Sequence, residues 1–258
     1  MATLSTQQIQ FEQALIALLE SLGIDGSGDG GGFGGFGTIS DARLAIILLA
    51  KVKLDEILPN VEGLQFTVEG SVNVSDPLNI MCNALMDEAA KRVLMNCPTH
   101  YLDPVKSNIT TGTADSDDNK IGTIPLPANF LRFISLKMAD WYRSVPASQI
   151  ISQSHPLYNL QVNKYTRGGT VKPVAVLAHR EVGGSQVRVI EYYSVSSSHA
   201  IDYLYYIQET VAENVQSNLI DALTWVIAGM VLQITERVDL AKVAFEQEQL
   251  CYQNLPTL

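Results

Sequence analysis

The sequence predicts an α+β protein in which a helical bundle carries a β-rich insertion between its third helix and a long C-terminal helix. Three observations lead to this prediction: apolar residues recur with a helical period in the N-terminal third, alternate with a period of two in the middle, and return to a helical period near the C-terminus. With 258 residues, of which 47% are hydrophobic and 17% charged, the chain can bury a substantial core.

The changes in period divide the chain into three parts. Residues 1–97 supply the N-terminal helices of the bundle and include a glycine-rich loop at 23–38. Residues 98–207 form the β-rich insertion, and residues 208–258 form the long C-terminal helix and a short tail.

The N-terminal part is expected to hold three helices. The first spans residues 5–22 and ends before the glycine-rich loop, because a run of glycines loses much backbone entropy on ordering and favours a flexible connector. Ser40 and Asp41 are typical capping residues, so the second helix is expected to begin there and to end near Pro59.

The third helix is expected to begin at Asp76 and Pro77, because Asp caps a helix and Pro is tolerated in its first turn. Its apolar face consists of Ile80, Leu85, Ala89, Val93 and Leu94. Between the second and third helices, residues 64–74 alternate in hydrophobicity and are compatible with a hairpin.

The middle part has the pattern of strands. Its β-branched and aromatic residues alternate in short runs, and Gly168-Gly169 and Gly183-Gly184 separate them as hairpin turns do. The runs are FLRFISLKM, YNLQVNKYTRG, KPVAVLAHREVGG, SQVRVIEYY and AIDYLYYI. From Thr210 to Leu250 the helical period returns and predicts the longest helix of the chain.

Charge changes along the same boundaries. The segment from Phe130 to Tyr193 has a net charge of +5, whereas the other residues together carry −15, which makes −10 for the chain. A basic strand region on an acidic helical body suits contacts between copies, because opposite potentials steer and register partners. Simple solvation of both surfaces is an equally good interpretation. The negative total argues against tight binding of nucleic-acid phosphates.

No catalytic, cofactor or metal site is predicted, and two apparent motifs fail on inspection. Gly26, Gly28 and Gly31 satisfy G-x-G-x-x-G, but they follow a helix, whereas a nucleotide cradle needs a strand, a turn and a helix. Asp115, Asp117 and Asn119 are spaced like the first ligands of a calcium loop. Lys120, however, takes the place of the glycine that makes the sharp turn, and Leu126 takes the place of the bidentate glutamate.

The cysteines leave one minor alternative open. The odd number of cysteines, Cys82, Cys97 and Cys251, favours reduced thiols over a disulfide framework. A zinc or cysteine hydrolase could use Cys97, His100 and one carboxylate, although structural zinc sites usually show two close ligand pairs and only one is present.

Five tyrosines at the end of the strand region admit two interpretations. Such residues form cross-strand aromatic pairs inside sheets, and they are also enriched at protein interfaces. The five are Tyr192, Tyr193, Tyr203, Tyr205 and Tyr206. The sheet interpretation is the simpler of the two.

Four short motifs occur in order between the helical parts: Ile124-Pro-Leu-Pro-Ala-Asn-Phe-Leu-Arg132, Trp141-Tyr-Arg143, Lys172-Pro-Val174 and Val189-Ile-Glu-Tyr-Tyr193. In this order the sequence resembles the head-to-tail connector proteins of tailed bacteriophages. It is most similar to the adaptor ring proteins of short-tailed and crAss-like phages, and the resemblance covers about Ile121 to Ile207. The flanking helices agree in order and length.

The resemblance implies a structural virion protein without enzymatic activity. Copies of the family form a ring, typically a dodecamer, between the portal and the tail, and the ring extends the DNA channel for genome retention and ejection. The implied partners are further copies of the chain, the portal protein, a downstream tail or ring protein, and double-stranded DNA that passes through the lumen without tight binding. Neither a cofactor nor a membrane is implied. The implied location is the virion, after assembly in the host bacterial cytoplasm.

On this reading the subunit or portal interface uses bases of the strand region and the C-terminal tail. The residues expected there are Arg132, Lys137, Arg143, Arg167, Arg180, Arg188, Tyr252, Leu255 and Leu258. Family members often send a C-terminal extension into the portal, and the tail of this chain is short. An oligomeric scaffold unrelated to phages is the main alternative.

Overall fold

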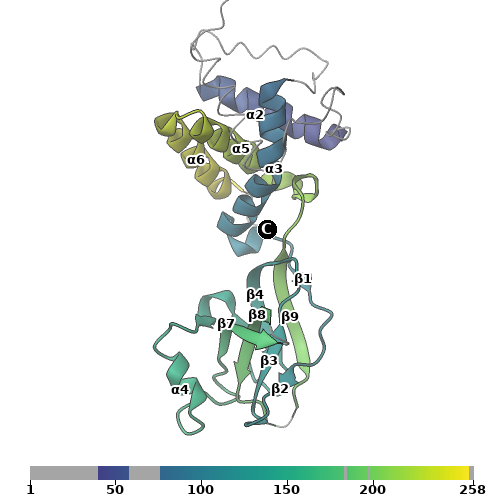
Figure 1. The fold of residues 1–258 in the computed structure, drawn as a ribbon, viewed down its shortest axis with the longest axis vertical. Helices are drawn as coiled ribbons and strands as arrows, with labels where there is room; N and C mark the ends of the chain where they lie inside the picture. The colour runs from purple at the N-terminus through teal and green to yellow at the C-terminus, as the bar shows by residue number, and fades with distance from the viewer. Residues whose placement is uncertain (1–39, 58–75, 183–184, 197, 256–258) are drawn as a thin grey trace, which may run out of the picture. The chain divides into compact units, whose positions relative to one another are not determined.

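The structure, a computed structural model, describes residues 40–57, 76–182, 185–196 and 198–255. The chain divides into two compact units (Figure 1). One unit contains the described residues up to Pro98 and from Thr210 onward, and the other contains residues 99–209. The helix predicted at 5–22, the glycine-rich loop and the hairpin predicted at 64–74 lie outside the described residues.

The predicted helical bundle with a β-rich insertion is wrong. The chain is α+β, but sheets dominate: the described residues hold a four-stranded sheet, a five-stranded sheet and five α-helices, one of which has only five residues. The strands form a unit with a core of their own. Periodicity reports which face of a segment is apolar, and it does not report which segments share a core.

The described part of the first unit contains four α-helices: α2 (Asp41–Ile57), α3 (Pro77–Asn96), α5 (Ile220–Ile234) and α6 (Val238–Gln253). The predicted starts of α2 and α3 are confirmed, since the Arg43 amide donates to Ser40 Oγ at 3.3 Å and the Leu78 amide donates to Asp76 Oδ1 at 3.1 Å. These caps satisfy backbone donors that have no partner inside the helix.

Helix α5 is the central helix of this unit and packs against α2, α3 and α6. The segment Ser217–Ile234 is long and apolar enough to cross a membrane by composition, but 61% of it is buried inside the structure, as in a core helix. Gly229 allows α5 and α6 to approach closely, because a Cβ at this position would lie 2.4 Å from the Phe245 ring.

The single long C-terminal helix predicted from 210 to 250 is also wrong. Two short 3-10 helices, η3 (Ala212–Asn214) and η4 (Ser217–Leu219), precede α5, and α5 and α6 are separate. At the end of α5, Glu236 has a φ of 59°. The amide of Arg237 donates to the Leu232 carbonyl at 2.9 Å. This is a Schellman motif, and the usual signal of glycine is missing because glutamate occupies the left-handed position.

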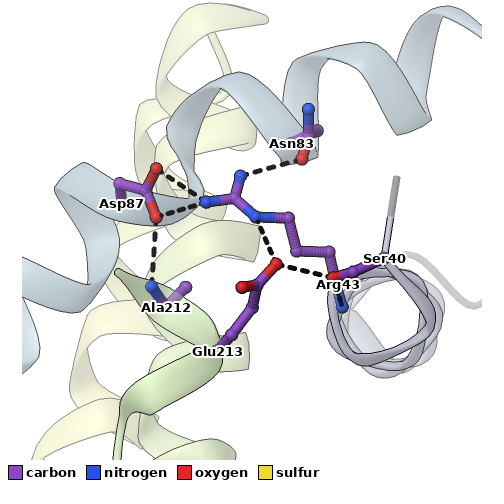
Figure 2. Close-up of polar contacts among 6 residues, drawn as sticks. All are labelled: Ser40, Arg43, Asn83, Asp87, Ala212 and Glu213. Atoms are coloured by element: carbon purple, nitrogen blue, oxygen red, sulfur yellow. Dashed lines mark hydrogen bonds and ion pairs between the residues drawn. The ribbon is translucent and has the colours of Figure 1, made fainter. Parts of the chain in front are cut away.

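A polar cluster ties α2 to α3 and η3, as Figure 2 shows. The Arg43 guanidinium donates to both oxygens of Asp87 at 2.7 and 2.8 Å, to Glu213 at 2.9 Å and to Asn83 at 3.1 Å. Asp87 also accepts from the Ala212 amide at 3.0 Å. One guanidinium therefore links three segments that are far apart in the sequence.

The cluster makes the stability of the helical unit sensitive to acid. Partial burial alone would raise the pKa of Asp87, but hydrogen bonds from Arg43 and the Ala212 amide outweigh burial and hold this pKa below its ordinary value. The stabilisation is therefore complete above about pH 4 and is lost as the pH falls through the lowered pKa of the folded state.

We expect Asp87→Asn to lower the free energy of unfolding at pH 7 by about 1 kcal/mol, the scale of a half-exposed ion pair. Because protonation also removes the Asp87 charge, the difference from the wild type should shrink as the pH falls from 6 to 3. Urea denaturation followed by Trp225 fluorescence measures it. A difference that does not change over this range would contradict the assigned role of Asp87.

The second unit contains two sheets, with strand orders β1-β9-β4-β5 and β2-β3-β8-β7-β6. The strands are β1 (Val105–Lys106), β2 (Thr113–Ala114), β3 (Ile121–Pro125), β4 (Phe130–Met138), β5 (Val145–Pro146), β6 (Ile151–Ser152), β7 (Ala175–Val182), β8 (Ser185–Tyr193) and β9 (Ile201–Gln208). Helices η1 (Thr99–Tyr101), η2 (Ala147–Gln149) and α4 (Tyr158–Val162) complete the unit. Both sheets contribute to one buried cluster that includes Phe133, Leu136 and Ile190.

Four of the five predicted strand runs are confirmed as β4, β7, β8 and β9. Strands β7 and β8 pair antiparallel with Val182 opposite Ser185, and the predicted turn at Gly183-Gly184 lies outside the described residues. The run at 158–168 is wrong, because it contains the short helix α4. Gly168-Gly169 follows this helix and does not join two strands of a hairpin.

Candidate interaction surface

The segment between β6 and β7, residues 153–174, forms a lobe that we call the α4 lobe (Figure 1). It carries five exposed large apolar side chains: Leu157, Leu160, Val162, Tyr165 and Val171. Tyr142 joins them, since its amide donates to the Thr170 carbonyl at 3.1 Å and its side chain is 80% exposed. Single exposed apolar residues are normal, but six in one small lobe are typical of a surface that binds another protein.

Hydrogen bonds within the lobe fix its backbone. Gln161 is buried, donates to the Leu157 carbonyl at 3.3 Å and accepts from the Gly168 amide at 3.0 Å. The hydroxyl of Thr166 donates to the Leu160 carbonyl at 2.8 Å. In this segment the polar Gln161 is buried and its apolar neighbours Leu160 and Val162 are exposed, the reverse of the arrangement that the alternating pattern predicted.

Arg167 anchors the lobe to the loop before β3. Its guanidinium lies 2.8 Å from the Asp118 carboxylate, and its side chain is only 7% exposed. A hydrogen bond from the Lys120 amide and the ion pair with Arg167 hold the pKa of Asp118 below its ordinary value. Arg167 is therefore a structural residue in this unit. The carbonyl of the next residue, Gly168, accepts a hydrogen bond from the Ser194 hydroxyl, and Ser194 has a φ of 64°.

Arg180 provides a second anchor. Its Nε donates to the buried carboxylate of Glu191, which also accepts from the Tyr193 hydroxyl at 2.6 Å, and its Nη2 donates to the Tyr158 hydroxyl at 3.3 Å. Burial and the neighbouring Glu191 carboxylate raise the pKa of Tyr193. Because β7 and β8 hold Arg180 and Glu191, this network attaches the start of α4 to the five-stranded sheet.

Other predicted interface bases also have partners inside the unit. Lys137 pairs with Asp202 at 2.6 Å, and Arg188 lies 5.5 Å from the centre of the Phe130 ring. Arg132 is half-buried on β4. Arg143 is exposed and forms no ion pair with the described residues. Of the predicted bases, Arg143 is thus the one with its charge most available to a partner.

The described C-terminal residues that were predicted for the interface belong to the helical unit. Tyr252 is buried in the helical unit and donates to Glu248 at 2.9 Å, so its ring is not offered to a partner. Leu255 is half-buried, and Leu258 lies outside the described residues.

The structure adds residues that the sequence analysis did not select. Lys164 and Lys172 are exposed beside the apolar side chains of the lobe, and Lys164 lies 5.1 Å from the centre of the Tyr165 ring. One sequence signal could have found them: residues 141–180 contain five bases and no acid. The net charge of this short segment, counted apart from the adjacent strands, indicates where the bases are concentrated.

The tyrosine cluster belongs mostly to the core. Tyr192 and Tyr193 are almost fully buried, and the Tyr192 hydroxyl lies 2.7 Å from His199 Nδ1. The rings of Tyr206 and Phe130 stack across β9 and β4 with centroids 5.8 Å apart. The interpretation as a cross-strand aromatic pair is confirmed for Tyr206, and Tyr192 and Tyr193 are buried in the strand unit.

The candidate nucleophile of the hydrolase alternative is buried, whereas its candidate base is exposed. Cys82 and Cys97 are fully buried, and His100 is exposed. Burial raises the pKa of Cys82 to about 12, and burial with a hydrogen bond to Asp221 raises the pKa of Cys251 to about 12, so both thiols stay protonated at neutral pH. No group of three or more His, Cys, Asp or Glu residues in the described ranges could hold a metal ion.

No protein-family model and no curated protein matches the chain. The resemblance to phage adaptors therefore stays a prediction based on the sequence motifs. In the structure, the motif from Ile124 to Arg132 spans the end of β3 and the start of β4, and the motif from Val189 to Tyr193 is the buried half of β8. Both motifs contribute to the core of the strand unit.

Proposed function

We propose that this chain is a structural assembly protein that acts by binding other protein chains. Following the resemblance, we propose that it forms an adaptor ring between the portal and the tail of a bacteriophage. The α4 lobe is the observation that supports the proposal most directly, because it combines exposed apolar side chains with a backbone held by Gln161, Arg167 and Arg180. A preorganised surface loses little entropy on binding.

The composition of the lobe favours a protein partner over nucleic acid. Leu157, Leu160, Val162 and Val171 expose aliphatic surface, which adds little to phosphate binding but stabilises a protein interface. The total charge of −10 also favours loose passage of DNA. DNA in the lumen of the proposed ring is thus a cargo and not a tightly bound ligand.

The distribution of charge favours assembly in which two different surfaces of the chain meet. The described residues of the helical unit carry twelve acids and seven bases, whereas residues 141–180 of the strand unit carry five bases and no acid. Copies of such a chain attract each other when the helical unit of one meets the strand unit of another.

Sedimentation velocity and electron microscopy of the purified chain, alone and mixed with the portal protein of the same genome, test the proposal. We expect closed rings, and we expect Tyr165→Asp to reduce assembly at least tenfold because a carboxylate replaces an exposed aromatic side chain of the lobe. Val211→Asp introduces the same charge at a residue that is 42% exposed outside the lobe and should assemble like the wild type.

The outcomes separate the alternatives. Rings that form without any affinity for the portal would favour an oligomeric scaffold unrelated to phages. A chain that stays monomeric at high concentration, with or without the portal protein, would contradict an assembly function. Elemental analysis that finds stoichiometric zinc would favour the hydrolase alternative.

A further inference from the structure

Helix α6 has an outer face with two parallel rows of different chemistry. Val243 and Leu250 are seven residues apart and are 42% and 44% exposed. Asp239 and Glu246 are also seven residues apart, each four positions before one of these apolar residues, and both are exposed. Residues spaced by four and seven lie on the same side of a helix, so an acidic row runs beside an apolar row.

The rest of α6 faces the opposite way. Ala241, Ala244, Glu248 and Tyr252 are buried against the helical unit. The Asp239 and Glu246 carboxylates have no ion-pair partner within the described part of the chain. Lys242 is exposed as well, three residues after Asp239 and four before Glu246, and no ion pair joins it to either carboxylate in the described part of the chain. The outer face is therefore an apolar surface with a small net negative charge.

The α4 lobe has the complementary composition. Its exposed apolar residues, among them Leu160 and Tyr165, lie with Arg143, Lys164 and Lys172, which form no ion pairs with described residues. The exposed apolar side chains of the two surfaces can bury each other, and the unpaired bases of the lobe have the opposite charge to the unpaired acids of α6.

We propose that the α4 lobe of one copy binds the outer face of α6 in a second copy. This inference rests on the proposed self-assembly and assigns its contact. A pair of lobes would place like positive charges together, and a pair of α6 faces would place like negative charges together, so charge disfavours both symmetric contacts. A contact between two different surfaces is heterologous. When the rotation from each copy to the next adds up to a full turn, repetition of such a contact produces a closed ring.

Two variants that each damage one surface test the contact. Leu160→Asp with Tyr165→Asp damages the lobe, and Val243→Asp with Leu250→Asp damages the outer face of α6. All four side chains are exposed, so the variants should fold, and far-UV circular dichroism together with Trp141 and Trp225 fluorescence checks this. The single changes Tyr165→Asp and Leu250→Asp replace any double variant that does not fold.

Each variant alone is expected to sediment as a monomer under conditions in which the wild type assembles. An equimolar mixture should form dimers and nothing larger, because the intact lobe of one variant can bind the intact α6 face of the other. The two damaged surfaces both carry added carboxylates and repel each other. The expected result is a doubling of mass, from 28.2 kDa for one chain.

A mixture that stays monomeric while the wild type assembles would overturn this inference and leave the proposed function standing. An α6 variant that assembles like the wild type would overturn it too. A wild type that does not self-associate, alone or with its portal protein, would instead remove the proposed function on which the inference rests.

Discussion

Leu223→Asp is expected to unfold the helical unit. Leu223 is fully buried in α5, the helix that contacts α2, α3 and α6. A carboxylate there has no charge partner, and we expect the free energy of unfolding to fall by about 4 kcal/mol or more. Because a small unit lies near the lower end of the usual stability range of about 5–15 kcal/mol, a loss of this size removes most of its stability and should unfold a measurable fraction of the molecules at 25 °C.

The chain offers a reporter for each unit. It contains two tryptophans, of which Trp225 lies in α5 and Trp141 is buried in the strand unit. We expect the emission of Trp225 to shift to the red in Leu223→Asp, whereas Trp141, in a unit with its own core, should keep its native emission. Versions in which one tryptophan is replaced by phenylalanine separate the two signals.

Leu49→Asp is the matched control, because it makes the same chemical change on α2 at a side chain that is 46% exposed. It should change stability by less than about 0.5 kcal/mol, the usual limit for surface substitutions. A Leu223→Asp chain with the wild-type denaturation midpoint would show that α5 is not the core of the unit.

Arg92→Ala is expected to lower the free energy of unfolding by about 3 kcal/mol, since it leaves a buried charge without its partner. The Glu248 side chain is completely buried, and the Arg92 guanidinium lies 3.5 Å from its Oε2 atom. Glu248 Oε1 accepts from Asn96 at 3.0 Å and from the Tyr252 hydroxyl at 2.9 Å. Arg92 also lies 3.7 Å from the centre of the Phe245 ring, so its removal costs packing as well as charge.

A double-mutant cycle separates charge from packing. Glu248→Gln keeps an oxygen acceptor for Asn96 and Tyr252 and removes the buried charge. Urea denaturation followed by Trp225 fluorescence should therefore show that Arg92→Ala costs less in the Glu248→Gln background than in the wild type. An equal cost in both backgrounds would mean that Arg92 acts through the Phe245 contact alone.

Much of the local structure could be predicted from the sequence. The starts of α2 and α3 follow from capping by Ser40 and Asp76, and β4 and β8 coincide with the predicted runs. Inside β4 the burial departs from strict alternation, because shifts in the pairing with β9 place Phe133 and Leu136 in the core three residues apart. Such bulges depend on the partner strand and are not visible in one segment.

The candidate site could be predicted only in part. The basic character of the middle region identified Arg143, but most other selected bases are used within the unit, such as Arg167 with Asp118 and Arg180 with Glu191. A count of charges cannot separate a free base from a paired one, because pairing depends on residues distant in the sequence. Nor could it show that Tyr165 is exposed.

By itself the sequence determined the type of most secondary-structure elements and where several of them begin, because caps and periodicity act between residues a few positions apart. Only the tertiary structure decided that the strands form two sheets around their own core and that the last helix breaks at Glu236. It also decided that the apolar residues of the α4 lobe face solvent. These features depend on which distant residues meet, and burial is a property of that assembly and not of any one segment.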